Sequence, residues 1–235
     1  MVQPPGDLRA FEDGGFGYRR LGESELLCAD AVPLTRLAAE IGTPFYAYAA
    51  GGIRARYQSF AQATAPLKAT ICYALKANDN PSILRLYARL KAGADVVSGG
   101  ELRRALEAGI PAKRVIFSGV GKSEGEIRLA LSSGIAQFNV ESEPELRAIA
   151  AIADELRLAA PVAFRVNPDV AAETHDKIST GRGHDKFGIA LEDAETLYRA
   201  VQNAPWLKTV GLAVHIGSQV TSLSPFERAF GRLVE

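Results

Sequence analysis

A lysine stands where an apolar segment ends in ICYALKANDN, residues 71–80. Ile71 to Leu75 are predicted to form a buried strand, so the amine of Lys76 is expected at its carboxyl end, partly removed from water. Removal from water disfavours the ammonium and gives a nucleophile that can form a Schiff base with a carbonyl group. Alternatively, Lys76 only extends along apolar surface or contacts a phosphate, and its position alone does not decide.

Polar side chains also follow the other apolar segments. These residues are Asp95, Ser98, Ser118, Asn139, Arg165, Asn167, His215 and Ser218. In a βα barrel the carboxyl ends of all strands lie on one face, and that face holds the active site. The pattern therefore predicts a site for a small molecule at this face.

Three of the polar residues near these strand ends carry further expectations. Arg165 interrupts an apolar strand, and because a buried arginine is costly without a partner, we expect an acidic or phenolate group beside it. His215 is followed by Gly217 and Ser218, and this combination could hold a flat ring with a phosphate tail. Glu101 stands at the start of a predicted helix, where its charge suits the helix dipole, so a role in the site is optional.

The segment ETHDKISTGRGHDKFG, residues 173–188, contains the histidines His175 and His184 beside two aspartates. Its spacing matches no metal-ligand template, so no metal is predicted. Its glycines indicate a mobile loop at the active site instead. The two cysteines, Cys28 and Cys72, form neither a metal-ligand pattern nor a disulfide framework, which favours a reducing cytosol.

The elements that must position these residues alternate from about residue 44. Stretches with helical spacing separate short apolar segments at 70–75, 94–98, 114–119, 136–140, 162–167 and 210–217. None of these segments shows polar alternation, so both faces of the predicted sheet should be buried, as in a parallel sheet covered by helices. Their spacing of roughly 20 to 25 residues indicates successive βα units.

Capping signals place the helices between these strands. Asn80 and Pro81 are typical of an N-cap and a first helical residue, and Gly93 is expected to end that helix. Ser-x-x-Glu capping boxes are predicted to begin at Ser123, Ser142 and Ser224. Glycines expected just beyond helix ends are Gly109 and Gly134.

Two α/β architectures fit this alternation, a doubly wound open sheet and a (β/α)8 barrel. No glycine-rich nucleotide-binding motif follows any strand, and six successive units without a long crossover favour the barrel. We therefore predict an α/β fold with a TIM-type (β/α)8 barrel that is incomplete here, with about six βα units. Residues 1–41 are predicted to belong to a second, β-rich domain and residues 42–235 to the partial barrel, with the C-terminal remainder absent.

The composition limits the partners. Lysine plus arginine and aspartate plus glutamate each number 27, and this balance gives no support for nucleic acid or a membrane surface as the main partner. Apolar residues make up 47% of the chain and charged residues 23%, as in soluble globular proteins. No segment reaches membrane-spanning length and no signal sequence begins the chain, so we expect a cytoplasmic protein.

Seven motifs occur in an order and spacing that resemble the diaminopimelate decarboxylases: YALKAN, ADVVSGGEL, FNVES, RVNPDV, ETHDKISTG, KFGI and HIGSQ. That family belongs to the pyridoxal-phosphate decarboxylases with an alanine-racemase-like barrel. The resemblance covers about residue 42 to the end. The first and last motifs are shared with ornithine and arginine decarboxylases, whereas the stretch from Arg165 to Ile189 resembles the diaminopimelate enzymes more narrowly.

The resemblance implies pyridoxal 5'-phosphate as cofactor, held on Lys76 as an internal aldimine. It implies that Lys76 and His215 are the catalytic residues, with His215 stacked on the pyridine face. Other implied cofactor contacts are Asp95, Arg165 and Ser218, with Glu101 helping to place Lys76 and the ring. The implied reaction releases CO2 from meso-diaminopimelate and gives L-lysine, the last step of lysine biosynthesis.

Several family features are not found in this chain. The glutamate that pairs with the pyridine nitrogen, the glycine-rich phosphate loop, a cysteine-containing segment and a tyrosine would lie beyond residue 235. The resemblance also implies a homodimer whose sites form between two subunits. We therefore expect the complete protein to be an enzyme and residues 1–235 alone to be very weakly active at best.

Other functions stay open at this point. An ornithine, arginine or carboxynorspermidine decarboxylase shares the general motifs. A non-catalytic carrier of pyridoxal phosphate, or a decarboxylase-like regulator, would bind cofactor or protein without turnover. A sugar-phosphate barrel enzyme that uses Lys76 as a Schiff base lacks support from the remaining motifs.

Overall fold

A computed structural model describes residues 15–170, 187–218 and 220–234. In these ranges six strands form a continuous parallel sheet, and their order in the sheet follows their order in the chain. They are β4 (Cys72–Ala74), β5 (Gly93–Val96), β6 (Val115–Phe117), β7 (Gln137–Val140), β8 (Ala160–Asn167) and β10 (Leu207–Ala213). A doubly wound sheet reverses its strand order, so this sequential order confirms the barrel.

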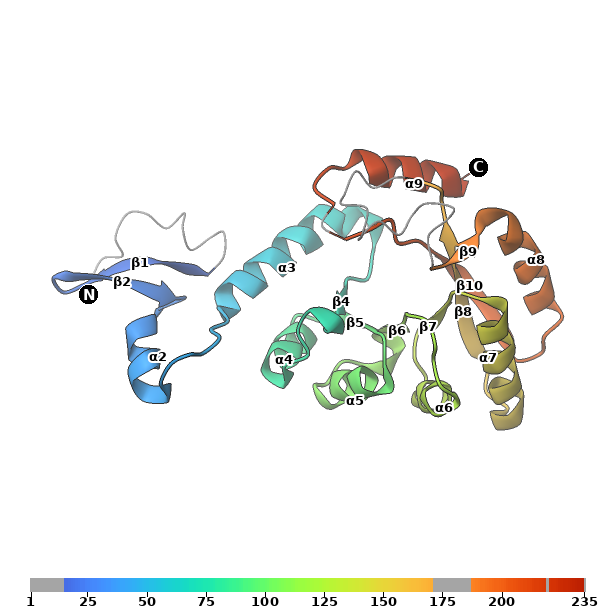
Figure 1. The fold of residues 1–235 in the computed structure, drawn as a ribbon, viewed down its shortest axis with the longest axis horizontal. Coiled ribbons are helices and arrows are strands. Elements are labelled where there is room, and N and C mark those ends of the chain that lie inside the picture. The colour runs from blue at the N-terminus through green and yellow to red at the C-terminus, as the bar shows by residue number, and fades with distance from the viewer. Residues whose placement is uncertain (1–14, 171–186, 219, 235) are drawn as a thin grey trace.

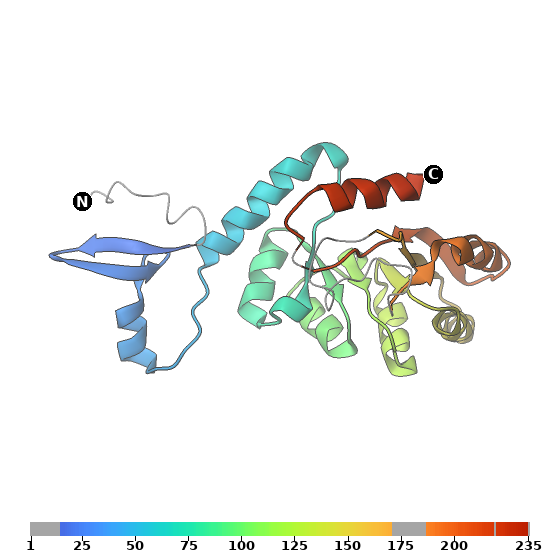
Figure 2. The same ribbon diagram turned by 45° about the horizontal axis from the view of Figure 1, so that its top comes forward.

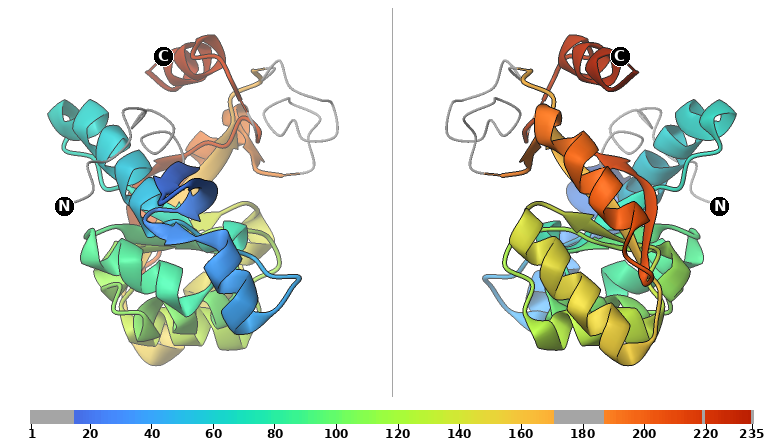
Figure 3. Two further views of the ribbon diagram at one scale, coloured as in Figure 1. Left: turned by 90° about the vertical axis from the view of Figure 1, so that its left-hand side faces the viewer. Right: turned by 90° about the vertical axis from the view of Figure 1, so that its right-hand side faces the viewer.

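Five helices alternate with these strands. They are α4 (Pro81–Arg89), α5 (Gly99–Glu107), α6 (Glu124–Ser133), α7 (Glu143–Leu156) and α8 (Leu191–Gln202). Figure 1 shows them in an arc along one side of the sheet, which we call its outer face. A further helix, α9 (Ser224–Val234), lies on the other side of the strands from α4 to α7 (Figures 1 and 3).

The outer face carries the core of the structure. Its residues form rows across neighbouring strands, and one such row is Val96, Phe117, Phe138 and Val162. All four side chains are fully buried beneath the helices. Burying a large apolar side chain contributes about 1.5 to 3 kcal/mol, so rows of this kind hold the sheet and the helices together.

The opposite, inner face differs from the sequence prediction, which expected both faces to be buried. Asp95, Ile116, Gln137 and Asn139 lie on it and are only half-buried. The six described strands curve without pairing β10 to β4, so no strand stands opposite this face. At the edge strand β10, Val210 and Leu212 are 44% and 42% exposed, because β10 pairs only with β8 among the described strands.

The predicted strand positions are confirmed, although β8 begins earlier than predicted and β10 both begins and ends earlier, and one strand was missed. β9 (Ile189–Ala190) pairs with the carboxyl end of β8, opposite Val166 and Asn167. Two residues are too few to show a periodic pattern, so the sequence gives no signal for it. Its effect is to extend the sheet at the end where the polar residues gather.

Most predicted helix boundaries are confirmed. The Asn80 side chain accepts a hydrogen bond from the Ser82 N–H as an N-cap, and Ser123 with Glu126 forms a complete capping box. Gly134 ends α6 in the left-handed conformation, with a φ of 69°.

Three boundary predictions need correction. Gly93 does not end α4, because the helix stops at Arg89 and Gly93 begins β5. Ser142 caps α7, but the Glu145 carboxylate binds other partners instead of closing the box. Ser224 is already the first residue of α9, so its capping box does not form.

The N-terminal part is rich in β structure, as predicted. β1 (Phe16–Leu21) and β2 (Ser24–Ala29) form an antiparallel hairpin, followed by β3 (Val32–Pro33) and α2 (Leu34–Ile41). Figure 2 shows this hairpin unit apart from the barrel sheet, with the long helix α3 (Ala50–Thr64) running between them. The domain boundary at residue 41 stays a prediction.

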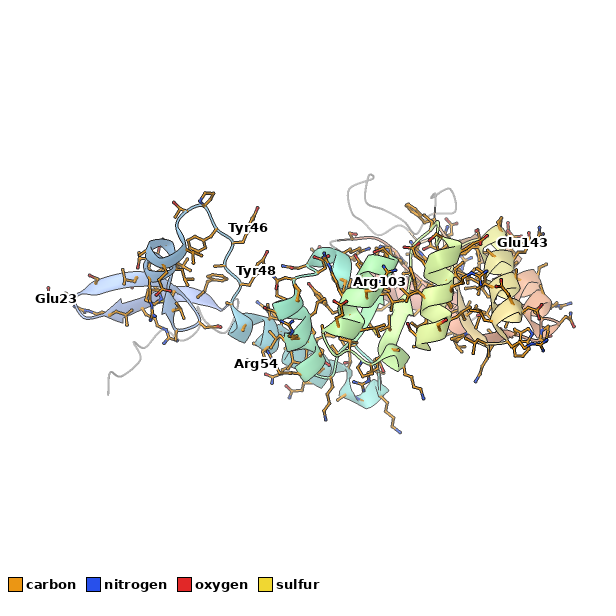
Figure 4. The ribbon with its side chains drawn as sticks, turned by 90° about the horizontal axis from the view of Figure 1, so that it is seen from below. Glu23, Tyr46, Tyr48, Arg54, Arg103 and Glu143 are labelled. Atoms are coloured by element: carbon orange, nitrogen blue, oxygen red, sulfur yellow. The ribbon has the colours of Figure 1, made fainter. Side chains whose placement is uncertain are left out.

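The segment between α2 and α3 is open to solvent. It carries Tyr46 and Tyr48, which are 90% and 52% exposed (Figure 4). Asp30 fixes the start of α3, because its carboxylate accepts a hydrogen bond from the Gly51 N–H at 2.9 Å. Three short 3-10 helices complete the elements: η1 (Ala65–Leu67), η2 (Leu75–Ala77) and η3 (Ala112–Arg114). In the described ranges no helix is long and apolar enough to span a membrane.

Candidate functional site

Lys76 lies at the carboxyl end of β4, within the 3-10 turn η2, as the sequence predicts. Its side chain is exposed, whereas the sequence predicts partial removal from water. The reason is its position. β4 is an edge strand of the described sheet, and no described strand faces it from across the barrel. The predicted place of the amine is therefore confirmed, and its predicted desolvation is wrong for this structure.

A hydrogen-bonded row crosses the inner face beside Lys76. The Ser118 hydroxyl donates to the Asp95 carboxylate at 2.5 Å, and the Asn139 amide donates to the Ser118 hydroxyl at 2.9 Å. The Gln137 amide in turn donates to the Asn139 side-chain oxygen at 2.8 Å. The row ties the carboxyl ends of β5, β6 and β7 together and fixes the orientation of Asp95.

The electrostatics of Asp95 show which groups converge on it. Burial raises the pKa of its carboxyl, and the Ser118 hydrogen bond acts in the opposite direction. The positive charges of Lys76 and Arg165 also favour the ionised carboxylate. The structure therefore brings Lys76, Asp95 and Arg165 into one electrostatic environment.

Arg165 has the acidic partner that the sequence predicts. Its guanidinium donates to the Glu141 carboxylate at 2.9 Å, and the side chains of Arg165 and Glu141 are only 13% and 1% exposed. The guanidinium also lies over the Phe187 ring, 5.8 Å from its centroid. Buried Arg165 Nε, Glu141 Oε2 and Asn167 Oδ1 have no hydrogen-bond partner among the described residues. Such unpaired groups are costly, so this cluster retains a capacity to bind a polar ligand.

His215 follows the end of β10 and is half-buried. Burial lowers the pKa of its imidazole, and the positive charges of Arg165 and Lys76 lower it further. Because the ordinary pKa of histidine is already near 6.5, this shift favours the neutral imidazole at neutral pH. The imidazole ring is flat in either protonation state, and Gly217, with a φ of 144°, adopts a backbone conformation that favours glycine.

Two predicted residues stand outside this cluster of contacts. Ser218 is exposed, directly after Gly217. The Glu101 carboxylate accepts a hydrogen bond from the Val97 N–H at 2.8 Å and so closes the turn before α5. This supports the simpler interpretation of Glu101 as a residue that stabilises the start of a helix.

The sequence reasoning missed a buried ion pair beside the site. Lys122 and Glu145 form it, and their side chains are 1% and 8% exposed. Glu141 was also given no role, although it directly follows a predicted strand, within FNVES. A polar residue at a strand end was a usable signal for Glu141, whereas a lysine in a loop looks like an ordinary surface residue.

Metal binding has no support in the described ranges, where no three His, Cys, Asp or Glu residues form a possible ligand group. His175 and His184, together with most of the predicted loop, lie outside the described residues.

The cluster can hold one particular kind of ligand. Lys76 supplies an amine for a carbonyl carbon, His215 a flat neutral ring, and Arg165 an unpaired donor for an anionic oxygen. These groups fit an aldehyde on an aromatic ring with oxyanion substituents. Pyridoxal phosphate has this composition.

Comparisons with known proteins agree with this geometry. The model of the family described as pyridoxal-dependent decarboxylase, pyridoxal binding domain, matches residues 50–235. A diaminopimelate decarboxylase of Zymomonas mobilis is 47% identical over 212 residues, which cover 89% of this chain and 50% of that protein. The chain thus spans about half the length of the curated relatives it matches.

Solved structures give the same result. The diaminopimelate decarboxylase of Helicobacter pylori, complexed with L-lysine, matches with a TM-score of 0.83 and 42% identity over 85% of this chain and 51% of that chain. A lysine decarboxylase of Selenomonas ruminantium matches with a TM-score of 0.74 and 28% identity over 92% of this chain and 51% of that chain. The chain therefore belongs to the family of pyridoxal-dependent decarboxylases and carries its pyridoxal binding domain.

Proposed function

We propose that the complete protein containing this chain decarboxylates meso-diaminopimelate to L-lysine and CO2 with pyridoxal phosphate as cofactor. The observation that carries the proposal is the joint presence of Lys76, Asp95, Arg165 and His215 at the carboxyl ends of the strands in a pyridoxal binding domain. The substrate rests on the higher identity to diaminopimelate decarboxylases, 42% for a solved structure that holds L-lysine, against 28% for a lysine decarboxylase.

Lys76 would hold the cofactor covalently. Its exposed amine stands at the end of an edge strand, where a carbonyl compound can reach it from the open inner face. Asp95 is fixed by Ser118 and would orient the amine through its negative charge. When bound, pyridoxal phosphate accepts the electron pair that remains on the substrate when the carboxylate departs as CO2.

His215, Arg165 and Ser218 would hold the remaining parts of the cofactor. A neutral imidazole at His215 would stack on the ring without adding a positive charge to it. Arg165, oriented by Glu141, would donate its unpaired Nε–H to an anionic oxygen. The exposed Ser218 hydroxyl would be available for a phosphate.

The reaction is tested with the complete protein and four amino acids supplied one at a time: diaminopimelate, ornithine, arginine and lysine. We expect CO2 release that is fastest with diaminopimelate and that depends on added cofactor, with L-lysine as the product. A preference for another amino acid would overturn the substrate. Bound cofactor without CO2 release from any of the four would favour a non-catalytic carrier or regulator.

Further features belong to the same proposal. The complete protein would be a cytoplasmic homodimer, with a small amino acid as its substrate and neither nucleic acid nor a membrane as a partner. Residues 1–235 alone would turn over substrate very weakly or not at all. Sedimentation of the complete protein tests the homodimer, and an assay of residues 1–235 tests their weak turnover.

A further inference from the structure

A buried lysine joins three elements at the carboxyl ends of the strands. Lys122 lies between β6 and α6, and its ammonium donates to the backbone oxygens of Gly119 at 2.6 Å and Asn139 at 2.9 Å. Its third partner is the Glu145 carboxylate in the first turn of α7. An ammonium has three N–H donors, so all of them are used.

This saturation determines what Lys122 can do. Its side chain is 1% exposed, and its ammonium lies 5.5 Å from the centroid of the Phe117 ring, which belongs to the buried outer row. A fully hydrogen-bonded and buried ammonium is not available as a nucleophile or as a donor to a ligand. Its role must lie in the groups that it holds.

The first group leads to Asp95. Lys122 fixes the backbone oxygen of Asn139, whose side chain donates to Ser118, and Ser118 donates to Asp95. The placement of Asp95 therefore depends on the position of β7, which Lys122 ties to the loop after β6.

The second group leads to Arg165. The Glu145 carboxylate binds Lys122 with one oxygen and accepts from the Glu141 N–H at 2.9 Å with the other. Glu141 in turn holds the Arg165 guanidinium at 2.9 Å. Lys122 thus stands where the contacts that place Asp95 and those that place Arg165 meet.

We propose that Lys122, together with Glu145, is a positioning residue that holds Asp95 and Arg165 where the cofactor can contact them. The inference rests on the proposed function, because it concerns the same site. The proposed role of Lys122 is to place other groups, and it takes no part in the chemistry. None of its described hydrogen bonds reaches the amine of Lys76 or the imidazole of His215.

The test uses the complete protein and the double variant Lys122→Met with Glu145→Met. Replacing a buried ion pair by apolar side chains of similar volume is often neutral for stability, so this variant should fold. It lacks the bonds to Gly119, Asn139 and Glu141, and it should bind pyridoxal phosphate more weakly by a factor on the order of 10 to 100. The absorbance spectrum of its bound cofactor should also differ from that of the wild type.

The matched control is Arg128→Met. Arg128 on α6 pairs with Glu155 on α7 at 2.7 and 2.5 Å, so this exposed pair also ties α7 to its neighbour in the sequence, without a described link to the site. We expect unchanged cofactor affinity and spectrum in this control. Thermal melting of all three proteins, with binding measured well below the lowest melting temperature, separates misplacement from unfolding.

The outcomes distinguish the two claims. If the wild type binds cofactor at Lys76 and the double variant binds it with equal affinity and an equal spectrum, the inference is overturned and the proposed function stands. If the wild type does not bind cofactor at Lys76, the proposed function itself fails. Should the double variant not fold, the single variant Glu145→Gln provides the measurement, because its amide cannot accept from the Glu141 N–H without turning its oxygen away from Lys122.

Discussion

The two faces of the barrel sheet differ in polarity and in burial. On the outer face, rows such as Val96, Phe117, Phe138 and Val162 are apolar and fully buried beneath the helices. On the inner face, Asp95, Gln137 and Asn139 are half-buried and joined by hydrogen bonds. The difference teaches that a single set of strands can carry its stability on one face and its chemistry on the other.

The two faces nevertheless meet at the carboxyl ends of the strands. Lys122 lies over the Phe117 ring of the outer row and also binds the backbone of Asn139. Substitutions on each face should therefore produce distinct effects, and substitutions at this junction should produce both.

The largest expected effect concerns Lys76 on the inner side. Lys76→Ala should reduce decarboxylation by the complete protein on the order of 10³-fold or more, because the cofactor loses its covalent anchor. Since Lys76 is exposed, its melting temperature without cofactor should stay that of the wild type. An active Lys76→Ala protein would contradict the proposed role.

The opposite pattern is expected on the outer face. Phe138→Ala should lower the free energy of unfolding by about 3 to 5 kcal/mol, because Phe138 is fully buried and its ring stacks 6.2 Å from that of Phe117. Chemical denaturation measures this loss. The fraction that remains folded should still bind cofactor at Lys76. Loss of cofactor binding by folded Phe138→Ala would contradict the separate roles of the two faces.

A third prediction concerns the buried ion pair between Glu141 and Arg165. Glu141→Gln should cost about 1 to 3 kcal/mol of stability and also weaken cofactor binding, because Arg165 loses its charged partner. Glu143→Gln is the control, since Glu143 pairs with Arg147 at the surface, with side chains 56% and 75% exposed. That exposed pair should contribute about 0 to 1 kcal/mol. Equal effects of the two substitutions in denaturation would contradict the account.

The smallest expected effect is a pH dependence at Asp95. Burial raises the pKa of this carboxyl, so its contribution to stability is fullest below its ordinary pKa and is lost as pH rises through the folded-state pKa. Asp95→Asn, which stays neutral, should therefore gain stability over the wild type at neutral pH and lose that advantage in acid. Melting temperatures of both proteins across this range measure the effect, and an advantage that grows in acid would contradict it.

The strand ends were predictable because parallel strands bring their carboxyl ends together whatever their loops contain. This geometry identified Lys76, Asp95, Ser118, Asn139 and Arg165 before their contacts were known. The need for an acidic partner at Arg165 followed from the cost of burying a guanidinium.

The identity of the partners was not predictable. Glu141 reaches Arg165 only because β7 and β8 pair with Val140 opposite Phe164, and this register is a tertiary property. Burial of Lys122 similarly depends on how the loop after β6, β7 and α7 pack together, which is also a tertiary property. The half-exposed inner face was missed because Ile116 and Ala163 interrupt its polar pattern, so no strict alternation appears.

The most direct test of the central claim maps the covalent site of the cofactor. The complete protein is incubated with pyridoxal phosphate, reduced with borohydride and digested, and the modified lysine is located by mass spectrometry. We predict one dominant modification, at Lys76, which disappears in Lys76→Ala. Modification spread over surface lysines with Lys76 unmodified, in a protein shown by melting to be folded, would contradict the assignment of this site.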